Sequence, residues 1–246
     1  YKKVPSYDEY VSQYPILVYK DVWNRWNGIG EFQYKVDAGC GKPVIYLYPT
    51  KPTEVSVSFI KPVRLTVDIP SYDSGWKVKA DSFGNLIDLQ PDKTDCDKIN
   101  PKKLGLEYAK DACLAGVYPY IYWAGDVKAK YPKVQEGFVV ARADLKKTLE
   151  DKLAYIGLSD KEIKDMVEYW YPYMDEKDFA YYRLTFFQNK EMNSFAPMAV
   201  HPRPDSVIRV FLDWEGLDEE VFMKPQALQK VERKGFTLVE WGGLKR

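Results

Sequence analysis

The chain has 246 residues, of which 46% are hydrophobic and 29% are charged, and its 36 basic residues balance its 36 acidic ones. This neutral balance excludes the basic electrostatic footprint of a nucleic-acid-binding protein, and no apolar run reaches the roughly 20 residues of a transmembrane helix. The length suits one large domain or two small ones.

The N-terminal residues 1–39 are rich in aromatic side chains without a strict period, which indicates an arm or linker. Within it, residues 18–26 are predicted to form a short helix that Gly28 and Gly30 end. The chain begins at Tyr1, so we expect a mature form from which a signal peptide has been removed. Residues 40–246 are predicted to form a single domain.

Residues 42–49, with the sequence KPVIYLYP, are predicted to form an interior strand of that domain. Both faces of the strand are apolar, so both require cover: Ile45 and Leu47 share one face, and Val44 and the two tyrosines share the other. The flanking prolines suit the ends of a strand because they lack a backbone donor. Tyr46 and Tyr48 each need a hydrogen-bond partner if they are buried.

Residues 42–90 are predicted to form a β-meander in a small antiparallel sheet or sandwich, because apolar and polar side chains alternate along most of this stretch. Residues 91–117 are polar and rich in Lys and Asp, and we interpret them as an insertion. Cys96 and Cys113 lie near its ends and are predicted to form a disulfide, which suits an oxidising compartment. Cys40 is then the odd cysteine, either free or paired elsewhere; three reduced cysteines are the alternative.

Residues 143–171 are predicted to form a helical hairpin, with helices at 143–156 and 160–171. Ser159 and Glu162 have the spacing of a capping box for the second helix, and Pro172 is expected to stop it. Strands are predicted on both sides of this pair. The fold class is therefore α+β, with a mainly antiparallel mixed sheet and the hairpin packed on one face.

Two charged residues occur on otherwise apolar strand faces, Arg209 and Glu240. An unpaired buried charge is too costly to retain, so we predict that they pair or share a network. The alternative is a cleft carboxylate oriented by an arginine. A hydrolase of glycosidase or peptidase type would then use Glu240 with a second carboxylate, for which the candidates are Asp205, Asp213 and Glu215.

Other catalytic or metal-binding patterns are weak in this sequence. His201 is the only histidine and lies between prolines, where a solvated loop residue is expected; a catalytic role would need Cys40 as the thiol. Asp92, Asp95 and Asp97 could touch a calcium ion but are better interpreted as a solvated acidic patch. No nucleotide or metal motif is present, so no cofactor is expected.

Aromatic residues near strand ends are the candidate binding residues, namely Trp123, Trp214, Trp241, Tyr46 and Tyr48. Exposed rings at these positions would stack on sugars or peptides, whereas core packing is the structural alternative.

The segments KPVIYLYP at 42–49, YWAG at 122–125 and GFTLVEWGG at 235–243 resemble a family of uncharacterised bacterial proteins that are secreted or attached to the cell surface. The resemblance spans about residue 40 to the end and implies an extracellular or cell-surface location. We therefore expect a non-catalytic module that presents an aromatic-rich surface to a protein or glycan partner, or a subunit of a larger assembly. The hydrolase remains the alternative.

Overall fold

The computed structural model describes residues 16–20, 26–30, 41–127, 131–176 and 178–246. The chain divides into two compact units, Tyr1–Asp37 and Ala38–Arg246. Among the described residues, no helix combines the length and the apolar character needed to cross a membrane.

The described part of the first unit is an antiparallel hairpin of β1 (Ile16–Lys20) and β2 (Trp26–Gly30). The predicted helix over residues 18–26 is therefore wrong. β1 has the sequence ILVYK, and such β-branched and aromatic residues favour a strand over a helix. Gly28 and Gly30 pair within the hairpin instead of ending a helix.

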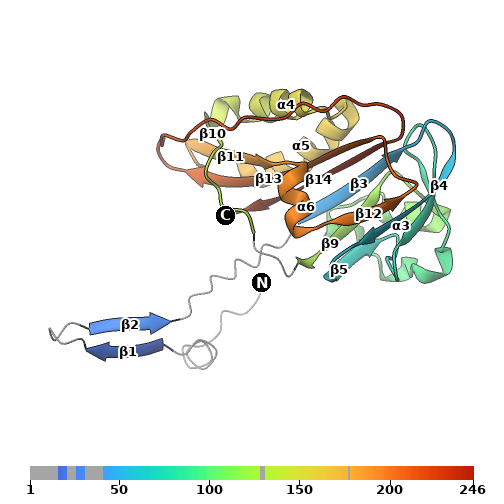
Figure 1. Cartoon of the computed structure of the whole chain (residues 1–246), viewed down its shortest axis with the longest axis horizontal. Helices are drawn as coiled ribbons and strands as arrows, with labels where there is room; N and C mark the ends of the chain where they lie inside the picture. The colour runs from blue at the N-terminus through green and yellow to red at the C-terminus, as the bar shows by residue number, and fades with distance from the viewer. Residues whose placement is uncertain (1–15, 21–25, 31–40, 128–130, 177) are drawn as a thin grey trace. The chain divides into compact units, whose positions relative to one another are not determined.

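The second unit is built on a seven-stranded sheet that is mainly antiparallel (Figure 1). The prediction of an α+β fold is confirmed. In spatial order its strands are β10 (Phe138–Ala141), β11 (Tyr181–Phe187), β13 (Ser206–Leu217), β14 (Thr237–Lys245), β3 (Gly41–Tyr48), β9 (Ile121–Val127) and β5 (Val63–Ile69).

Strand β3 is the interior strand that the sequence predicts, with β14 on one side and β9 on the other. Ile45 and Leu47 are fully buried on one face, and Val44 and Tyr46 on the other. The sequence predicted Pro43 at the beginning of the strand. In the structure it lies two residues inside the strand, which begins at Gly41. There the register with β14 shifts, and Pro43 packs against Gly242. Such a bulge accommodates a residue that cannot donate a ladder hydrogen bond.

A second sheet of five strands packs against the first. Its order is β12 (Met198–His201), β4 (Thr53–Phe59), β6 (Trp76–Ala80), β7 (Leu86–Asp88) and β8 (Val117–Tyr118). The rings of Phe59 and Trp123 join the sheets at a centroid distance of 4.8 Å. The strands are not connected as the predicted meander, because β5 pairs with β9 in the first sheet. Alternation fixes which face of a strand is buried but does not choose its partner.

Helices α4 (Leu145–Ile156) and α5 (Asp160–Asp175) form the predicted hairpin over one face of the seven-stranded sheet (Figure 1). Ser159 and Glu162 form the predicted capping box. The helix does not stop at Pro172, which lies inside α5. A proline removes one backbone hydrogen bond, and Trp170 and Met174 on either side of it are buried, so packing maintains the last turn. The short helix α6 (Asn189–Phe195) packs against β13 and β11.

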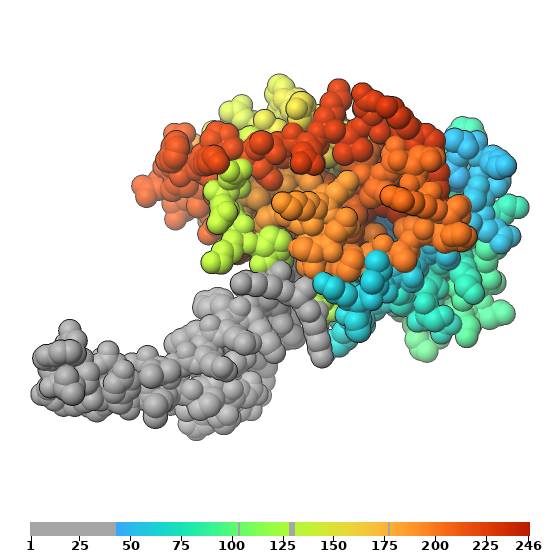
Figure 2. All heavy atoms as spheres, viewed as in Figure 1, coloured from blue at the N-terminus to red at the C-terminus, as the bar shows by residue number. Residues whose placement is uncertain are grey.

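The pair β13–β14 is parallel, in a sheet whose other pairs are antiparallel. A parallel pair needs a long crossover, and residues 218–235 supply it without a helix. The side chain of Gln226 exchanges two hydrogen bonds with the backbone of Phe186, and Val231 donates to the carbonyl of Ile156 at the end of α4. This crossover segment lies across the surface of the domain (red in Figure 2).

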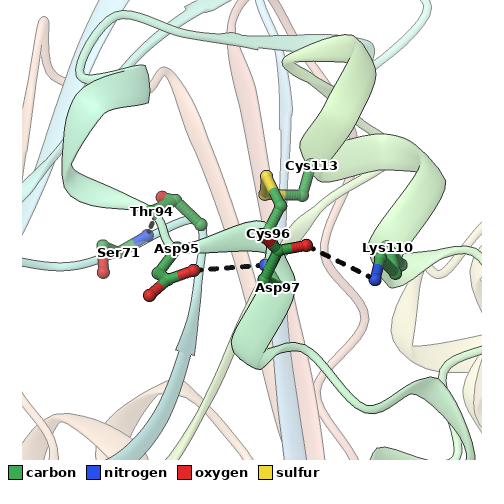
Figure 3. Close-up of a disulfide and its surroundings, with 7 residues drawn as sticks. All are labelled: Ser71, Thr94, Asp95, Cys96, Asp97, Lys110 and Cys113. Carbon is green, nitrogen blue, oxygen red and sulfur yellow. Dashed lines mark hydrogen bonds and ion pairs between the residues drawn. A yellow bond between two sulfur atoms is a disulfide. The ribbon is translucent and has the colours of Figure 1, made fainter.

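The predicted insertion contains two single-turn helices, η1 (Pro91–Lys93) and η2 (Cys96–Lys98), and the short helices α2 (Pro101–Leu104) and α3 (Ala109–Ala115). The predicted disulfide joins Cys96 to Cys113 and so fixes η2 to α3 (Figure 3). Asp95 and Asp97 pair with Lys98 and Lys110, as expected of a solvated patch.

We predict that the double variant Cys96→Ser/Cys113→Ser loses about 3 kcal/mol of unfolding free energy, because the disulfide closes a loop over a sequence separation of 17 residues. Urea unfolding with and without reductant measures this. The wild type in reductant should fall to the stability of the variant, and the variant should not respond to reductant. A wild type that gains the mass of two protons without losing stability would contradict the prediction.

Candidate functional site

Arg209 and Glu240 form the ion pair that the sequence predicts. The parallel register places them side by side on β13 and β14. Arg209 Nε donates to Glu240 Oε2 at 2.5 Å, and Trp123 Nε1 donates to Oε1 at 3.2 Å. The side chains of Arg209 and Glu240 are 2% and 0% exposed.

The rest of the Arg209 guanidinium anchors α6 and the residue that follows it. Its two terminal nitrogens donate to Asn193 Oδ1 at 2.6 Å and to the carbonyl of Ala196 at 2.7 Å. Every charged atom of the pair is thus partnered inside the protein. Glu240 is beyond the reach of a substrate, so this network stabilises the fold and does not form a cleft carboxylate.

The proposed second carboxylates are structural as well. Asp205 accepts a hydrogen bond from the backbone N–H of Phe236, at 2.8 Å. Asp213 is fully buried and accepts from Arg183 and Arg246, at 2.6 and 2.9 Å, and Glu215 pairs with Arg183 at 3.3 Å.

Four of the five aromatic candidates lie in the core, which corrects the prediction of an exposed binding surface at these positions. Trp123, Trp214, Trp241 and Tyr46 are each 1% exposed or less. They belong to interior strands that are covered on both faces, so rings near the strand ends are enclosed as well. Tyr48 alone is partly exposed, and the Arg233 guanidinium lies 5.0 Å from its ring.

The remaining candidates do not form a site. His201 is exposed at the end of β12, on the edge of the second sheet. Cys40 lies outside the described residues. Within the described ranges, no three His, Cys, Asp or Glu side chains are grouped as metal ligands.

A groove of about 450 Å³ runs between α5 and the insertion, and we call it the tyrosine groove. Residues 105–108, which connect α2 to α3, form one wall, and α5 forms the other. Gly105 makes this wall possible because its φ of +63° is a left-handed conformation that favours glycine. The lining residues are Gly105, Leu106, Glu107, Tyr108, Tyr120, Asp165, Glu168, Tyr169, Pro172 and Tyr173.

The four tyrosine rings of the groove meet at steep angles instead of forming a flat platform. Tyr108 and Tyr120 lie edge to face, with centroids 5.3 Å apart and planes at 81°. Tyr169 and Tyr173 are 5.2 Å apart at 54°. Tyr173 is the most accessible of the four, with 49% of its surface exposed. Rings in such an arrangement can surround a side chain from several directions.

The charges along the groove are negative. Glu107, Asp165 and Glu168 contribute carboxylates, and none of the described residues that line the groove is basic. Asp165 Oδ2 accepts from the Tyr46 hydroxyl at 2.8 Å and from Lys161 Nζ at 3.0 Å. The same ammonium lies 4.7 Å from the centroid of the Tyr46 ring.

Three phenols of the groove, those of Tyr108, Tyr120 and Tyr169, have a raised pKa and remain protonated at physiological pH. Burial raises the pKa of Tyr108, Tyr120 and Tyr169 well above the usual value. The nearby charge of Asp165 raises the pKa of the first two further, because a phenolate there would face a carboxylate. The groove therefore offers neutral hydroxyl groups and ring faces beside acidic side chains.

Sequence reasoning missed this groove because its residues come from segments that the fold brings together. One local signal was present: Tyr169 and Tyr173 are four residues apart and therefore share a face of α5, beside the buried stripe. Their opposite wall, residues 105–108, lies in the insertion and carries no pattern of its own. Comparisons with protein-family models, with curated proteins and with solved structures found no match to this chain.

We predict that Arg209→Met lowers the unfolding free energy by about 3–5 kcal/mol, because it leaves the Glu240 carboxylate buried without its countercharge. Replacing both residues by Met should recover part of the loss. Arg64→Met is the matched control, because Arg64 pairs with Asp126 at the surface and such pairs contribute at most about 1 kcal/mol. Urea unfolding compares the variants, and equal losses for Arg209→Met and Arg64→Met would contradict a structural role for the buried pair.

Proposed function

We propose that this chain is a non-catalytic extracellular binding module whose partner, a protein or a glycan, occupies the tyrosine groove. The observation that carries the proposal is the groove itself, in which four tyrosine rings and three carboxylates converge on a concave surface. Few polar groups among aromatic walls are typical of binding sites. Partner-binding surfaces are also enriched in tyrosine.

The extracellular part of the proposal rests on the disulfide and on the resemblance to secreted or surface-attached bacterial proteins. A bond between Cys96 and Cys113 persists in an oxidising compartment and is rare in the cytosol. The bond also bears on binding, because it holds α3 to η2 and Tyr108 immediately precedes α3. The disulfide thus holds in place the wall of the groove that contains Tyr108.

The hydrolase alternative has less support than binding. It was centred on Glu240, which is fully enclosed and whose two carboxylate oxygens already accept hydrogen bonds. A nucleophile or general acid must reach the bond that it cleaves. The groove supplies accessible rings and hydroxyl groups, and these support recognition.

We predict that Tyr173→Ala weakens partner binding about tenfold or more, because truncating a central aromatic contact costs at least about 1.4 kcal/mol. The probes are a displayed library of random linear peptides and a glycan array, applied to the wild type and the variant. Tyr155→Ala is the matched control, since Tyr155 is similarly exposed but lies on α4 outside the groove.

Ligands selected by the wild type should bind Tyr155→Ala normally and Tyr173→Ala poorly. If selected ligands bind all three proteins equally, or neither library yields a ligand, the proposal is wrong. Turnover of a bound glycan by the wild type would contradict its non-catalytic part.

A further inference from the structure

We infer that the tyrosine groove accepts a lysine or arginine side chain of a protein partner, an inference that rests on the proposed function. The groove is lined by three carboxylates; Asp165 already pairs with Lys161 at 3.0 Å, whereas Glu168 has only a 3.7 Å surface contact with Lys164 that a partner's cation can replace. A neutral sugar could stack on the rings but would not form an ion pair with a carboxylate of the groove. A basic side chain of a peptide can contact both the rings and a carboxylate.

One cation of the chain, the Lys161 ammonium, already makes contacts of this kind beside the groove. Lys161 Nζ donates to Asp165 at 3.0 Å and lies 4.7 and 5.9 Å from the ring centroids of Tyr46 and Tyr120. An ammonium held by a carboxylate over a ring face combines ion pairing with the cation–π attraction. Glu168, Tyr169 and Tyr173 supply a carboxylate and two rings to the lining of the same groove.

The carboxylate of Glu168 is available to a partner. Glu168 has 65% of its side chain exposed, and its contact with Lys164 is 3.7 Å long, with the lysine exposed as well. Such a surface contact is weak and is easily exchanged for a better one. The steep ring angles suit a side chain that enters between them more than a sugar that stacks on a flat platform.

Pro172 adds an acceptor at the same place. A proline has no N–H, so the carbonyl of Glu168 four residues earlier receives no helical hydrogen bond from it.

A second groove, of about 560 Å³, lies between α4 and α5 and shares Glu168 and Pro172 with the first. Its lining combines apolar side chains, among them Ala154, Ile163 and Val167, with six charged ones, of which four are acidic. An extended peptide can thus place a basic residue among the tyrosines and continue with apolar residues toward α4. We therefore assign the partner as a peptide segment in which a Lys or Arg adjoins apolar side chains.

The test is selection from a displayed random 12-residue peptide library on the full chain, followed by affinity measurement of the selected peptides. Enrichment of Lys or Arg beside apolar residues is expected. Replacing the basic residue by citrulline or norleucine should weaken binding about tenfold or more, and affinity should fall between 50 and 500 mM salt. Glu168→Gln should weaken the basic peptides about fivefold, and the exposed Glu219→Gln is the matched control.

The outcomes separate this inference from the proposed function. Neutral peptides or glycans whose binding requires Tyr173 would overturn the inference and leave the proposed function standing. An absence of any ligand that depends on Tyr173 would overturn both. Basic peptides that bind Glu168→Gln and Glu219→Gln alike would show attraction to the general charge of the surface and would overturn the assignment to the groove. Circular dichroism and thermal unfolding verify that each variant is folded.

Discussion

The buried pair of Arg209 and Glu240 is the constraint on which the second unit depends. The two residues can meet only because β13 and β14 run parallel and in this register. If one strand were shifted by one residue, Arg209 or Glu240 would point to the opposite face of the sheet. Both charges would then be buried without a partner, at a cost of several kcal/mol. The pair therefore fixes the one parallel contact of a sheet that is otherwise antiparallel, and Trp123 extends the network to β9.

The parallel pairing of β13 and β14 also affects how α5 is held. It requires the crossover segment 218–235, and Arg233 of that segment donates hydrogen bonds of 2.8 and 3.0 Å to the buried Glu162 at the start of α5. Glu162 also completes the capping box, so one carboxylate fixes both the crossover and the first turn of the helix. Asp165, Glu168 and Tyr169 follow within two turns. The position of the groove wall is thus linked to the ion pair through the path of the chain.

The sequence predicted features that depend on neighbouring residues or on the cost of burial. The helical hairpin, the interior strand at 42–49 and the pairing of Arg209 with Glu240 are of this kind, and so is the disulfide between Cys96 and Cys113. Strand order was not predicted, because β5 alternates equally well beside β4 or beside β9. The prediction that Trp214 and Trp241 are exposed was wrong for the same reason. Whether a side chain near a strand end is buried depends on which strands become interior strands of the sheet. The groove could not be predicted because its two walls are about 60 residues apart in the sequence.

The acidic residues of this domain fall into two groups with different consequences. Glu162, Asp213 and Glu240 are fully buried, and each accepts hydrogen bonds on both of its carboxylate oxygens. A ligand cannot reach carboxylates enclosed in this way, and removing one of their partners would destabilise the fold. Glu168 is different, because its side chain is largely in solvent and lies beside accessible rings. A change there alters the charge of the groove at little cost to the fold.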